Sequence, residues 1–340
     1  MSKWIDLSPE EMQAIATQVA DKKNITEGAV EKDWWVTAIL KAVFSLPISN
    51  YITFKGGTSL SKGWDLINRF SEDIDLALDR DFYLIEREEE CAKVPNNNQI
   101  KNLRKTHRAF INNEFCIQLN NQLEESGLSE CKVSTIIEKE DGSLIDSDSD
   151  PVVIEVHYPV KTHLDEYVRP VVKIEISCLS MKEPFEIKTL KSLVGNFYPE
   201  VDEETTATVP TILPTRTFLE KAFLLNEEYQ RKKPKTERMS RHLYDLERLM
   251  DTSFAKEALE DMELYRGIID HRKKFYHLGS VDYELNIPQN ISFCPEGEIK
   301  EKLRKDYENM KTSMIYGDKL NFDELICRLE ILQERFRETL

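Results

Sequence analysis

The spacing of apolar residues changes along the chain and divides it into two parts. Alternating segments rich in β-branched residues predict strands at Tyr51–Phe54, Asp73–Leu78, Cys131–Glu138, Val152–Tyr158 and Val171–Ser177. Apolar residues at helical spacing predict helices at 27–45, 58–67 and 101–125, and Ser8-Pro9-Glu10-Glu11 has the composition of a helix start. The first part is therefore predicted to hold a mixed sheet with helices.

The second part follows a stretch with no helical period. This stretch, 199–214, contains three prolines and is interpreted as a linker. Beyond it only helices are predicted, at 216–230, 236–251, 253–266, 297–315 and 322–338. We therefore predict an α+β fold, with a mixed sheet and helices over 1–210 and an all-helical domain over 211–340.

Composition narrows the class of protein. The net charge of −16 counts against nucleic acid as a partner, but the segments 101–108, 231–248 and 271–274 are locally basic, so a basic groove stays open. The six cysteines form no CxxC pair, and no run of about 18 apolar residues occurs, so we expect a cytoplasmic protein with reduced thiols and no membrane segment. The sequence lacks HExxH, GxxxxGK[ST] and GxSxG motifs, which argues against zinc proteases, P-loop NTPases and α/β-hydrolases.

Two carboxylates are the clearest chemical feature. Asp73 and Asp75 are two residues apart in a predicted strand, so they point to one face. Adjacent carboxylates repel each other unless a cation lies between them, and Mg²⁺ prefers such oxygen ligands together with substrate phosphates. The alternative is a solvent-facing strand edge that happens to carry acids.

The residues before this pair favour phosphate chemistry. Gly56 and Gly57 allow backbone N–H groups to approach a phosphate closely, and the helix predicted from Thr58 adds the positive end of its dipole. Arg69 and Ser71 place a guanidinium and a hydroxyl just before the acids. A phosphate cradle and paired carboxylates thus lie within one short stretch of chain.

Further polar residues come later in the chain. Glu175 shares one face of its strand with Lys173 and is the candidate third metal ligand, although such a strand is more often simply amphipathic. On the helix 236–251, an Arg241–Asp245 ion pair on a solvated face is the plain interpretation. Lys221 lies beside an apolar stripe, where a lysine is usually a surface residue.

Five ordered segments resemble the AbiEii/MenA-like nucleotidyltransferase toxin family, which belongs to the DNA polymerase β-type nucleotidyltransferase superfamily. These segments are Phe54-Lys55-Gly56-Gly57-Thr58-Ser59-Leu60, Arg69-Phe70-Ser71-Glu72-Asp73-Ile74-Asp75-Leu76, Val172-Lys173-Ile174-Glu175-Ile176, Arg216-Thr217-Phe218-Leu219-Glu220-Lys221 and Arg241-His242-Leu243-Tyr244-Asp245-Leu246. The resemblance spans roughly residues 50 to 250, and residues 252–340 match no motif.

The resemblance implies a nucleotidyltransferase-type sheet and a role for each motif. It implies catalytic roles for Asp73, Asp75, Lys221 and Asp245, with Asp245 either catalytic itself or orienting Lys221. It implies nucleotide contacts from Gly56, Gly57, Thr58, Arg69, Ser71 and Lys221, and Mg²⁺ or Mn²⁺ bound by Asp73, Asp75 and Glu175.

The resemblance also implies a reaction and partners. An NMP would move from an NTP to an acceptor hydroxyl, expected to be RNA and in particular the 3′ end of tRNA. The protein would be the toxin of a type IV-like toxin–antitoxin or phage-defence system and would have a cognate antitoxin. Two alternatives stay open: transfer to a small molecule or a protein, and a non-catalytic nucleotide-binding regulatory protein on the same scaffold.

Overall fold

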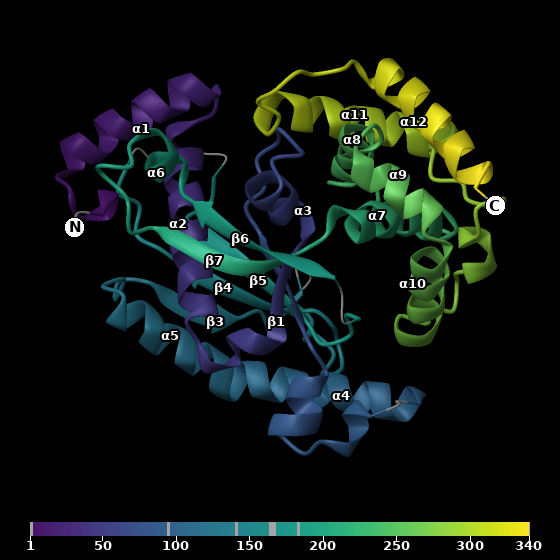
Figure 1. The fold of residues 1–340 in the computed structure, drawn as a ribbon, viewed down its shortest axis with the longest axis horizontal. Coiled ribbons are helices and arrows are strands. Elements are labelled where there is room, and N and C mark those ends of the chain that lie inside the picture. Colours follow the sequence, from purple (N-terminus) through teal and green to yellow (C-terminus); the bar gives the residue numbers. More distant parts are fainter. Residues whose placement is uncertain (1–2, 94–95, 140–141, 163–167, 182–183, 340) are drawn as a thin grey trace. The chain divides into compact units, whose positions relative to one another are not determined.

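The computed structural model describes residues 3–93, 96–139, 142–162, 168–181 and 184–339 (Figure 1). The chain forms two compact units. One, here called the sheet unit, comprises Met1–Gly63 and Phe70–Thr211. The other, the helical unit, comprises Trp64–Arg69 and Ile212–Leu340, so the short segment 64–69 leaves the sheet unit and belongs with the later helices.

The sheet unit is built on a mixed sheet of seven strands among the residues described. The strands are β1 Ile52–Lys55, β2 Ile74–Leu78, β3 Lys132–Thr135, β4 Val152–His157, β5 Val171–Ser177, β6 Phe185–Lys191 and β7 Thr206–Ile212. Their order is β3-β4-β5-β2-β1-β7-β6. β2 is antiparallel to β1 and parallel to β5, so it lies inside the sheet with a neighbour on each side.

The helices of the sheet unit bury the apolar face of these strands. They are α1 Pro9–Lys23, α2 Glu27–Phe44, α3 Gly56–Thr58, α4 Asn97–Phe110, α5 Cys116–Glu125 and α6 Leu193–Phe197. The predicted helix start at Ser8 is confirmed, because the side chains of Ser8 and Glu11 form a reciprocal capping box. The helix predicted over 27–45 is α2, and the helix predicted over 101–125 is α4 and α5 joined by one π-helical turn.

The helical unit contains α7 Pro214–Tyr229, α8 Ser240–Leu249, α9 Ser253–Glu260, α10 Met262–Phe275, α11 Gly297–Ser313 and α12 Phe322–Arg337. Aromatic rings fill its interior, with Phe336 in contact with Phe218, Tyr265 and Phe293. In the described part of 213–339 the only β-type contact is the isolated bridge between Arg69 and Ile315, so the all-helical prediction is confirmed. The predicted fold class is therefore correct.

Short helical turns complete the elements. They are Trp4–Asp6, Pro47–Tyr51, Ser59–Gly63, Phe82–Glu86, Glu90–Ala92, Ile111–Phe115 and Tyr283–Asn286. None of the helices in the described ranges is long and apolar enough to span a membrane.

Three predicted elements need correction. The stretch 199–214 is no linker, since Thr206–Ile212 forms β7 and pairs in parallel with β1 through Phe54 and Thr211. The helix predicted over 58–67 starts at Gly56 and ends at Gly63. The helix predicted over 253–266 is two helices, because the Asp261 side chain accepts a hydrogen bond from the Leu264 N–H and starts α10. The strand β6 was not predicted at all.

Candidate functional site

Strand register brings the predicted carboxylates of the sheet unit together. Asp75 on β2 lies opposite Lys55 on β1 and opposite Glu175 on β5. Residues in register on neighbouring strands point to the same face, so the three side chains form one row across the sheet. Ile74 and Leu76, which alternate with Asp75, are fully buried on the opposite face. Since β2 is an interior strand, the alternative of acids on a strand edge does not hold.

Asp73 continues this group at the start of β2. It lies two residues before Asp75 and is half-buried. Together with Asp75 and Glu175, it makes a set of three carboxylates near one end of β2. A set of oxygen donors of this kind suits a hard divalent cation.

Gly56 lies directly against the Asp75 carboxylate. Its φ is +80°, and a Cβ added there would lie 1.8 Å from Asp75 Oδ2 and 2.7 Å from Asp75 Cβ. Only glycine permits both this backbone conformation and this approach. Gly57 follows in the first turn of α3. The side chain of Lys55, the residue before α3, makes no capping hydrogen bond to this helix. Lys55 Nζ instead donates to Ser180 Oγ at 3.2 Å.

The Thr58 hydroxyl connects this glycine turn to the carboxylates. Thr58 is completely buried, and its hydroxyl donates to the backbone carbonyl of Asp73. Ser71 Oγ lies 3.0 Å from the same hydroxyl, within hydrogen-bond distance. The Thr58 side chain therefore fixes the turn relative to the segment that carries the acids.

Lys173 is a polar residue of this face to which the sequence assigned no role. It is half-buried, two residues before Glu175 on β5, and lies opposite Glu155 on β4. Its ammonium forms no hydrogen bond or ion pair with any residue in the described ranges. The two-residue period shared with Glu175 is the sequence signal that places it here.

The helical unit holds a second group around Asp245, whose side chain is 0% exposed. Arg69 donates to it twice, from Nε to Oδ1 at 2.7 Å and from Nη2 to Oδ2 at 2.8 Å. Lys221 on α7 places Nζ 2.8 Å from Oδ2. The predicted pairing of Lys221 with Asp245 is confirmed, and the pairing of Arg69 with Asp245 was not foreseen.

Two plainer interpretations of these residues are wrong. Lys221 is 7% exposed and is therefore no surface lysine. Asp245 is not on a solvated face and is bound by Arg69 and Lys221, where the sequence suggested Arg241. Arg69, expected at the nucleotide, is itself 3% exposed and directs its guanidinium to Asp245.

The charges of this cluster shift the pKa values of its members. Burial acts to raise the pKa of Asp245, but the Arg69 guanidinium and the Lys221 ammonium hold that pKa well below its usual range. Burial lowers the pKa of Lys221, while Asp245 opposes this shift. Burial and the nearby Lys221 charge also hold the pKa of His242 well below its usual value, so that ring is neutral. The Asp245 carboxylate thus lies between two cationic side chains, Arg69 and Lys221.

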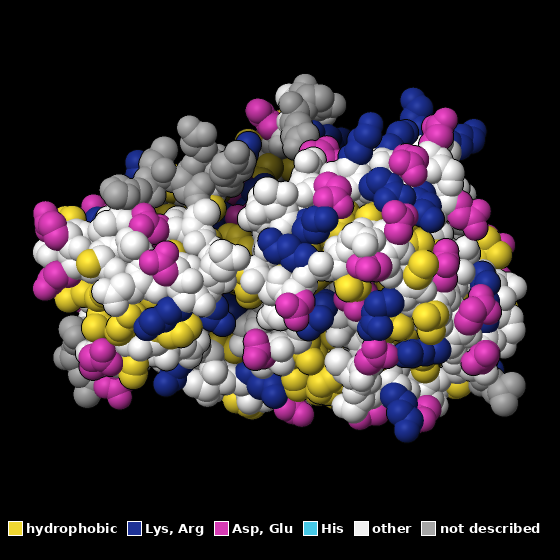
Figure 2. Space-filling view, turned by 90° about the horizontal axis from the view of Figure 1, so that it is seen from above, with side chains coloured by type: hydrophobic (Ala, Val, Ile, Leu, Met, Phe, Trp, Pro, Cys, Tyr) yellow, Lys and Arg dark blue, Asp and Glu magenta, His cyan; other side chains and the backbone are white. Residues whose placement is uncertain are grey.

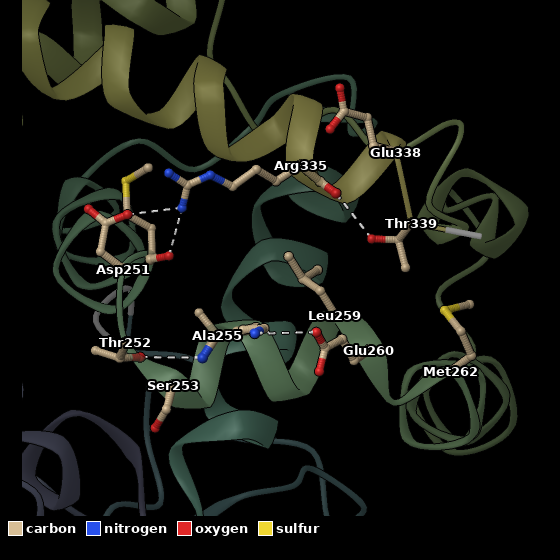
Figure 3. Close-up of a pocket in the computed structure, with 12 residues that line it drawn as sticks. Asp251, Thr252, Ser253, Ala255, Leu259, Glu260, Met262, Arg335, Glu338 and Thr339 are labelled. Atoms are coloured by element: carbon tan, nitrogen blue, oxygen red, sulfur yellow. Dashed lines mark hydrogen bonds and ion pairs between the residues drawn. The ribbon is translucent and has the colours of Figure 1, made fainter.

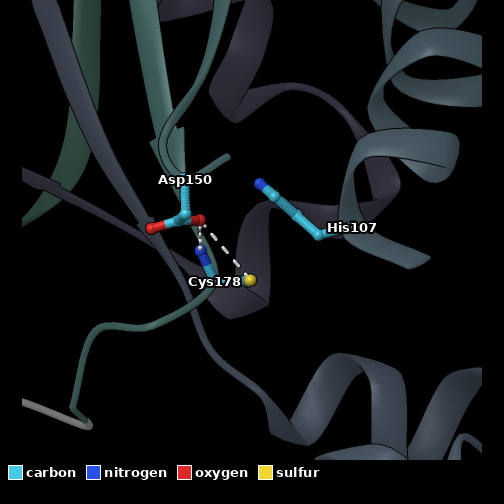
Figure 4. A group of neighbouring side chains, drawn as sticks. All are labelled: His107, Asp150 and Cys178. Atoms are coloured by element: carbon cyan, nitrogen blue, oxygen red, sulfur yellow. Dashed lines mark hydrogen bonds between the residues drawn. The ribbon is translucent and has the colours of Figure 1, made fainter. Parts of the chain in front are cut away.

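A third group, His107, Asp150 and Cys178, contains potential metal ligands (Figure 4). Both ring nitrogens of His107 are already used, because Nε2 lies 3.0 Å from the Ile176 carbonyl and Nδ1 lies 2.7 Å from the Tyr83 hydroxyl. Nε2 must donate to the carbonyl, and Nδ1 then accepts from the phenol. Asp150 accepts from the Cys178 N–H at 3.1 Å, and burial raises the pKa of the Cys178 thiol. This group fits a buried hydrogen-bond network and does not fit a metal.

A cavity of about 810 Å³ lies within the helical unit (Figure 3). It is lined by α9, the start of α10 and the end of α12, and none of the predicted site residues is part of its wall. Arg335 on its rim donates to Asp251 at 3.0 Å.

One of the comparisons with known proteins, the match to a family, agrees with the motifs. The sequence pattern of the family described as "Nucleotidyl transferase AbiEii toxin, Type IV TA system" matches residues 38–328. Among solved structures, the chain is similar to MenT4, a nucleotidyltransferase toxin from Mycobacterium tuberculosis H37Rv. The two share 13% sequence identity with a TM-score of 0.45, over 94% of this chain and 97% of that chain. No curated protein matches this chain.

The family match covers most of the chain, including both the carboxylate row of the sheet unit and the Lys221–Asp245 pair of the helical unit. The resemblance inferred from the five motifs is thereby confirmed. The protein belongs to the AbiEii family and is a nucleotidyltransferase toxin of a type IV toxin–antitoxin system.

Proposed function

We propose that this toxin transfers a nucleoside monophosphate from an NTP to the 3′-terminal hydroxyl of an RNA, specifically a tRNA, in a reaction that requires a divalent metal ion. The observation that carries the proposal is the row formed by Lys55, Asp75 and Glu175 in strand register, with Gly56 against the Asp75 carboxylate. Such an arrangement would suit oxygen ligands of a metal ion beside a backbone that binds phosphate.

The metal ligands would be Asp73, Asp75 and Glu175, whose carboxylates are the donors that Mg²⁺ or Mn²⁺ prefers. A bound divalent ion supplies charge neutralisation at the phosphates and lowers the pKa of the attacking hydroxyl. The protein supports this set through Thr58, which ties the glycine turn to the Asp73 carbonyl. Two of the proposed ligands, Asp75 and Glu175, would thus be held on strands, and Asp73 directly precedes β2.

The nucleotide phosphates would be bound by two kinds of group. In the sheet unit these are the backbone N–H groups of Gly56, Gly57 and Thr58, with the Ser71 hydroxyl beside them. In the helical unit Lys221 would contact the β- and γ-phosphates, because an ammonium on a flexible side chain can neutralise their charge. Asp245 would keep the Lys221 ammonium in place when no nucleotide is bound.

In the proposed reaction the oxygen of the acceptor hydroxyl attacks the α-phosphorus of the NTP. The bond between that phosphorus and the oxygen bridging to the β-phosphate breaks, and pyrophosphate leaves. The preorganised cations and N–H groups stabilise the charge that develops on the phosphate oxygens. A cognate antitoxin, as the family implies, would counteract this activity.

The test uses the purified protein with each α-labelled NTP in turn, MgCl₂ and either total RNA or purified tRNA. We expect label in the tRNA band of a denaturing gel with a preferred NTP, and loss of that label with EDTA or with Asp75→Asn. A protein gel and thin-layer chromatography of the same reactions report transfer to a protein or a small molecule. Label only in those fractions, or undiminished RNA labelling by Asp75→Asn, would contradict the proposal.

A further inference from the structure

A strongly basic loop joins α7 to α8. Over the face drawn in Figure 2, acidic and basic side chains are interspersed. The loop segment 231–238 departs from this mixture, since its charged residues are Arg231, Lys232, Lys233, Lys235 and Arg238 against the single acid Glu237. All six of these residues are exposed. A net positive segment thus stands out from a chain whose net charge is −16.

The nearest acids hold the backbone of the loop and do not neutralise its lysines. Glu228 accepts from the Lys235 backbone N–H at 2.7 Å, and Asp306 accepts from the Arg238 backbone N–H at 2.7 Å. Asp306 also accepts from the Ser240 N–H at 2.9 Å. These bonds fix both the middle and the end of the loop.

Three ammonium groups remain available on this fixed loop. Within the described ranges, Lys232, Lys233 and Lys235 form no side-chain hydrogen bond or ion pair, whereas Arg231 has Nε 3.2 Å from Glu228. Unpaired, exposed lysines on an anchored backbone are a preformed surface for a polyanion.

The loop is close to the buried cluster of the helical unit along both helices. Lys221 is ten residues before Arg231, and Asp245 is seven residues after Arg238. At 1.5 Å per residue these separations are about 15 Å and about 10 Å along the helix axes. At roughly 3.4 Å per nucleotide along a stacked strand, this corresponds to about three or four nucleotides.

We propose that the loop 231–238 is an RNA-binding surface, in which Lys232, Lys233 and Lys235 contact backbone phosphates of the acceptor a few nucleotides from its 3′ end. This inference rests on the proposed transfer to RNA and adds the surface that recognises the acceptor. A protein partner fits less well, because protein interfaces favour aromatic residues and disfavour lysine, and the segment has no aromatic side chain. Contacts to phosphates recognise RNA without reading its sequence.

The experiment compares two triple variants that lose the same charge. The test variant is Lys232→Gln/Lys233→Gln/Lys235→Gln, and the control is Lys93→Gln/Lys101→Gln/Lys105→Gln, which changes exposed lysines near and on α4, two of them in the basic segment 101–108. The binding of fluorescein-labelled tRNA is measured by anisotropy without NTP, over a range of KCl concentrations. Thermal unfolding checks that both variants keep the wild-type Tm within about 2 °C, as expected for exposed sites.

We expect the slope of log affinity against log salt to fall by about two for the test variant, at roughly 0.7 per lost phosphate contact. At about 0.15 M salt the affinity should fall by roughly tenfold to fiftyfold. The KM for tRNA should rise by a similar factor while the KM for NTP stays the same. The control should keep the wild-type slope.

A test variant that binds tRNA with wild-type affinity and salt slope would overturn the inference, as would wild-type protein that does not bind tRNA. The binding assay is independent of catalysis. Loop-dependent tRNA binding without any transfer of label would therefore reject the proposed function and retain the surface, whereas transfer with loop-independent binding would do the reverse.

Discussion

Replacing Asp245 with asparagine keeps the size of the side chain and removes its charge from a position that is 0% exposed. The carboxylate contacts Arg69 through two hydrogen bonds and Lys221 through one ion pair. An asparagine has a single oxygen for these three donors, and its NH₂ group would face a cation. Arg69 and Lys221 would therefore be left buried beside each other without a shared counter-charge.

The expected cost follows from the burial. Removing one partner of a buried ion pair costs about 3–5 kcal/mol, because the remaining charge stays desolvated. For domains of about 100–200 residues, 1 kcal/mol corresponds to roughly 3–5 °C in Tm, so Asp245→Asn should lower Tm by about 10–20 °C. The measurement is thermal unfolding by circular dichroism, repeated in urea to obtain the free energy of unfolding.

The effect should depend on pH with a definite sign. The pKa of Asp245 is depressed in the folded protein, so its contribution to stability is complete above the unfolded pKa of about 3.9 and is lost as the pH falls through the folded value. The stability difference between wild type and Asp245→Asn should thus be constant near neutrality and shrink on acidification below about pH 5.

Asp251 provides a matched control just beyond the same helix. It also contacts two arginines, with Arg328 at 2.6 Å and Arg335 at 3.0 Å, but its side chain is 55% exposed (Figure 3). Asp251→Asn should therefore cost no more than about 1 kcal/mol. Equal, small changes in Tm for Asp245→Asn and Asp251→Asn would refute the argument from burial.

Substitutions at four other residues test the proposed site. Asp73→Asn and Asp75→Asn should each lower nucleotide transfer by at least about 10²-fold while the Tm stays near that of wild type; near-normal turnover in either rules out the metal assignment. Lys221→Ala should raise the KM for NTP and lower kcat, with only partial rescue by Lys221→Arg, and unchanged kinetics would exclude Lys221 as a phosphate ligand. Gly56→Ala should lower turnover by about 10²-fold, because its Cβ would displace the Asp75 carboxylate. Gly127→Ala, at the same φ of +80° with open space around it, should leave turnover unchanged, and equal losses in both would show that backbone strain alone is responsible.

The sequence pattern predicted those strands whose alternating apolar residues are buried in the structure. On β5 the apolar residues Val172, Ile174 and Ile176 are buried, as their spacing required. The strand β7 was missed because Pro210 lies within it and proline is rare inside sheets. Its placement depends on pairing between Phe54 and Thr211, which are distant in sequence. The periodicity of apolar residues within one segment cannot reveal a contact with a distant segment.

For the same reason, only one part of the candidate site could be predicted from local sequence patterns. The carboxylates could be grouped from the sequence because Asp75 and Glu175 each occupy the polar face of an alternating strand. The burial of Lys221 and Asp245 could not be derived from local composition, since both lie on helices with ordinary amphipathic spacing. Their importance came from the family motifs. The contact of Asp245 with Arg69 had no signal in either.

The segment Trp64–Arg69 affects the order in which the protein can mature on the ribosome. Among the described residues before Ile212 it alone belongs to the helical unit, and it lies four residues before the strand that carries Asp75. Arg69 is synthesised 176 residues before Asp245, its partner in the folded protein. At roughly 5–20 residues per second this interval lasts about 10–35 s, during which the guanidinium lacks its contact with Asp245. A nascent or prematurely terminated chain therefore lacks the anchor of the segment next to its catalytic acids, and the proposed toxic activity is delayed until translation has passed α8.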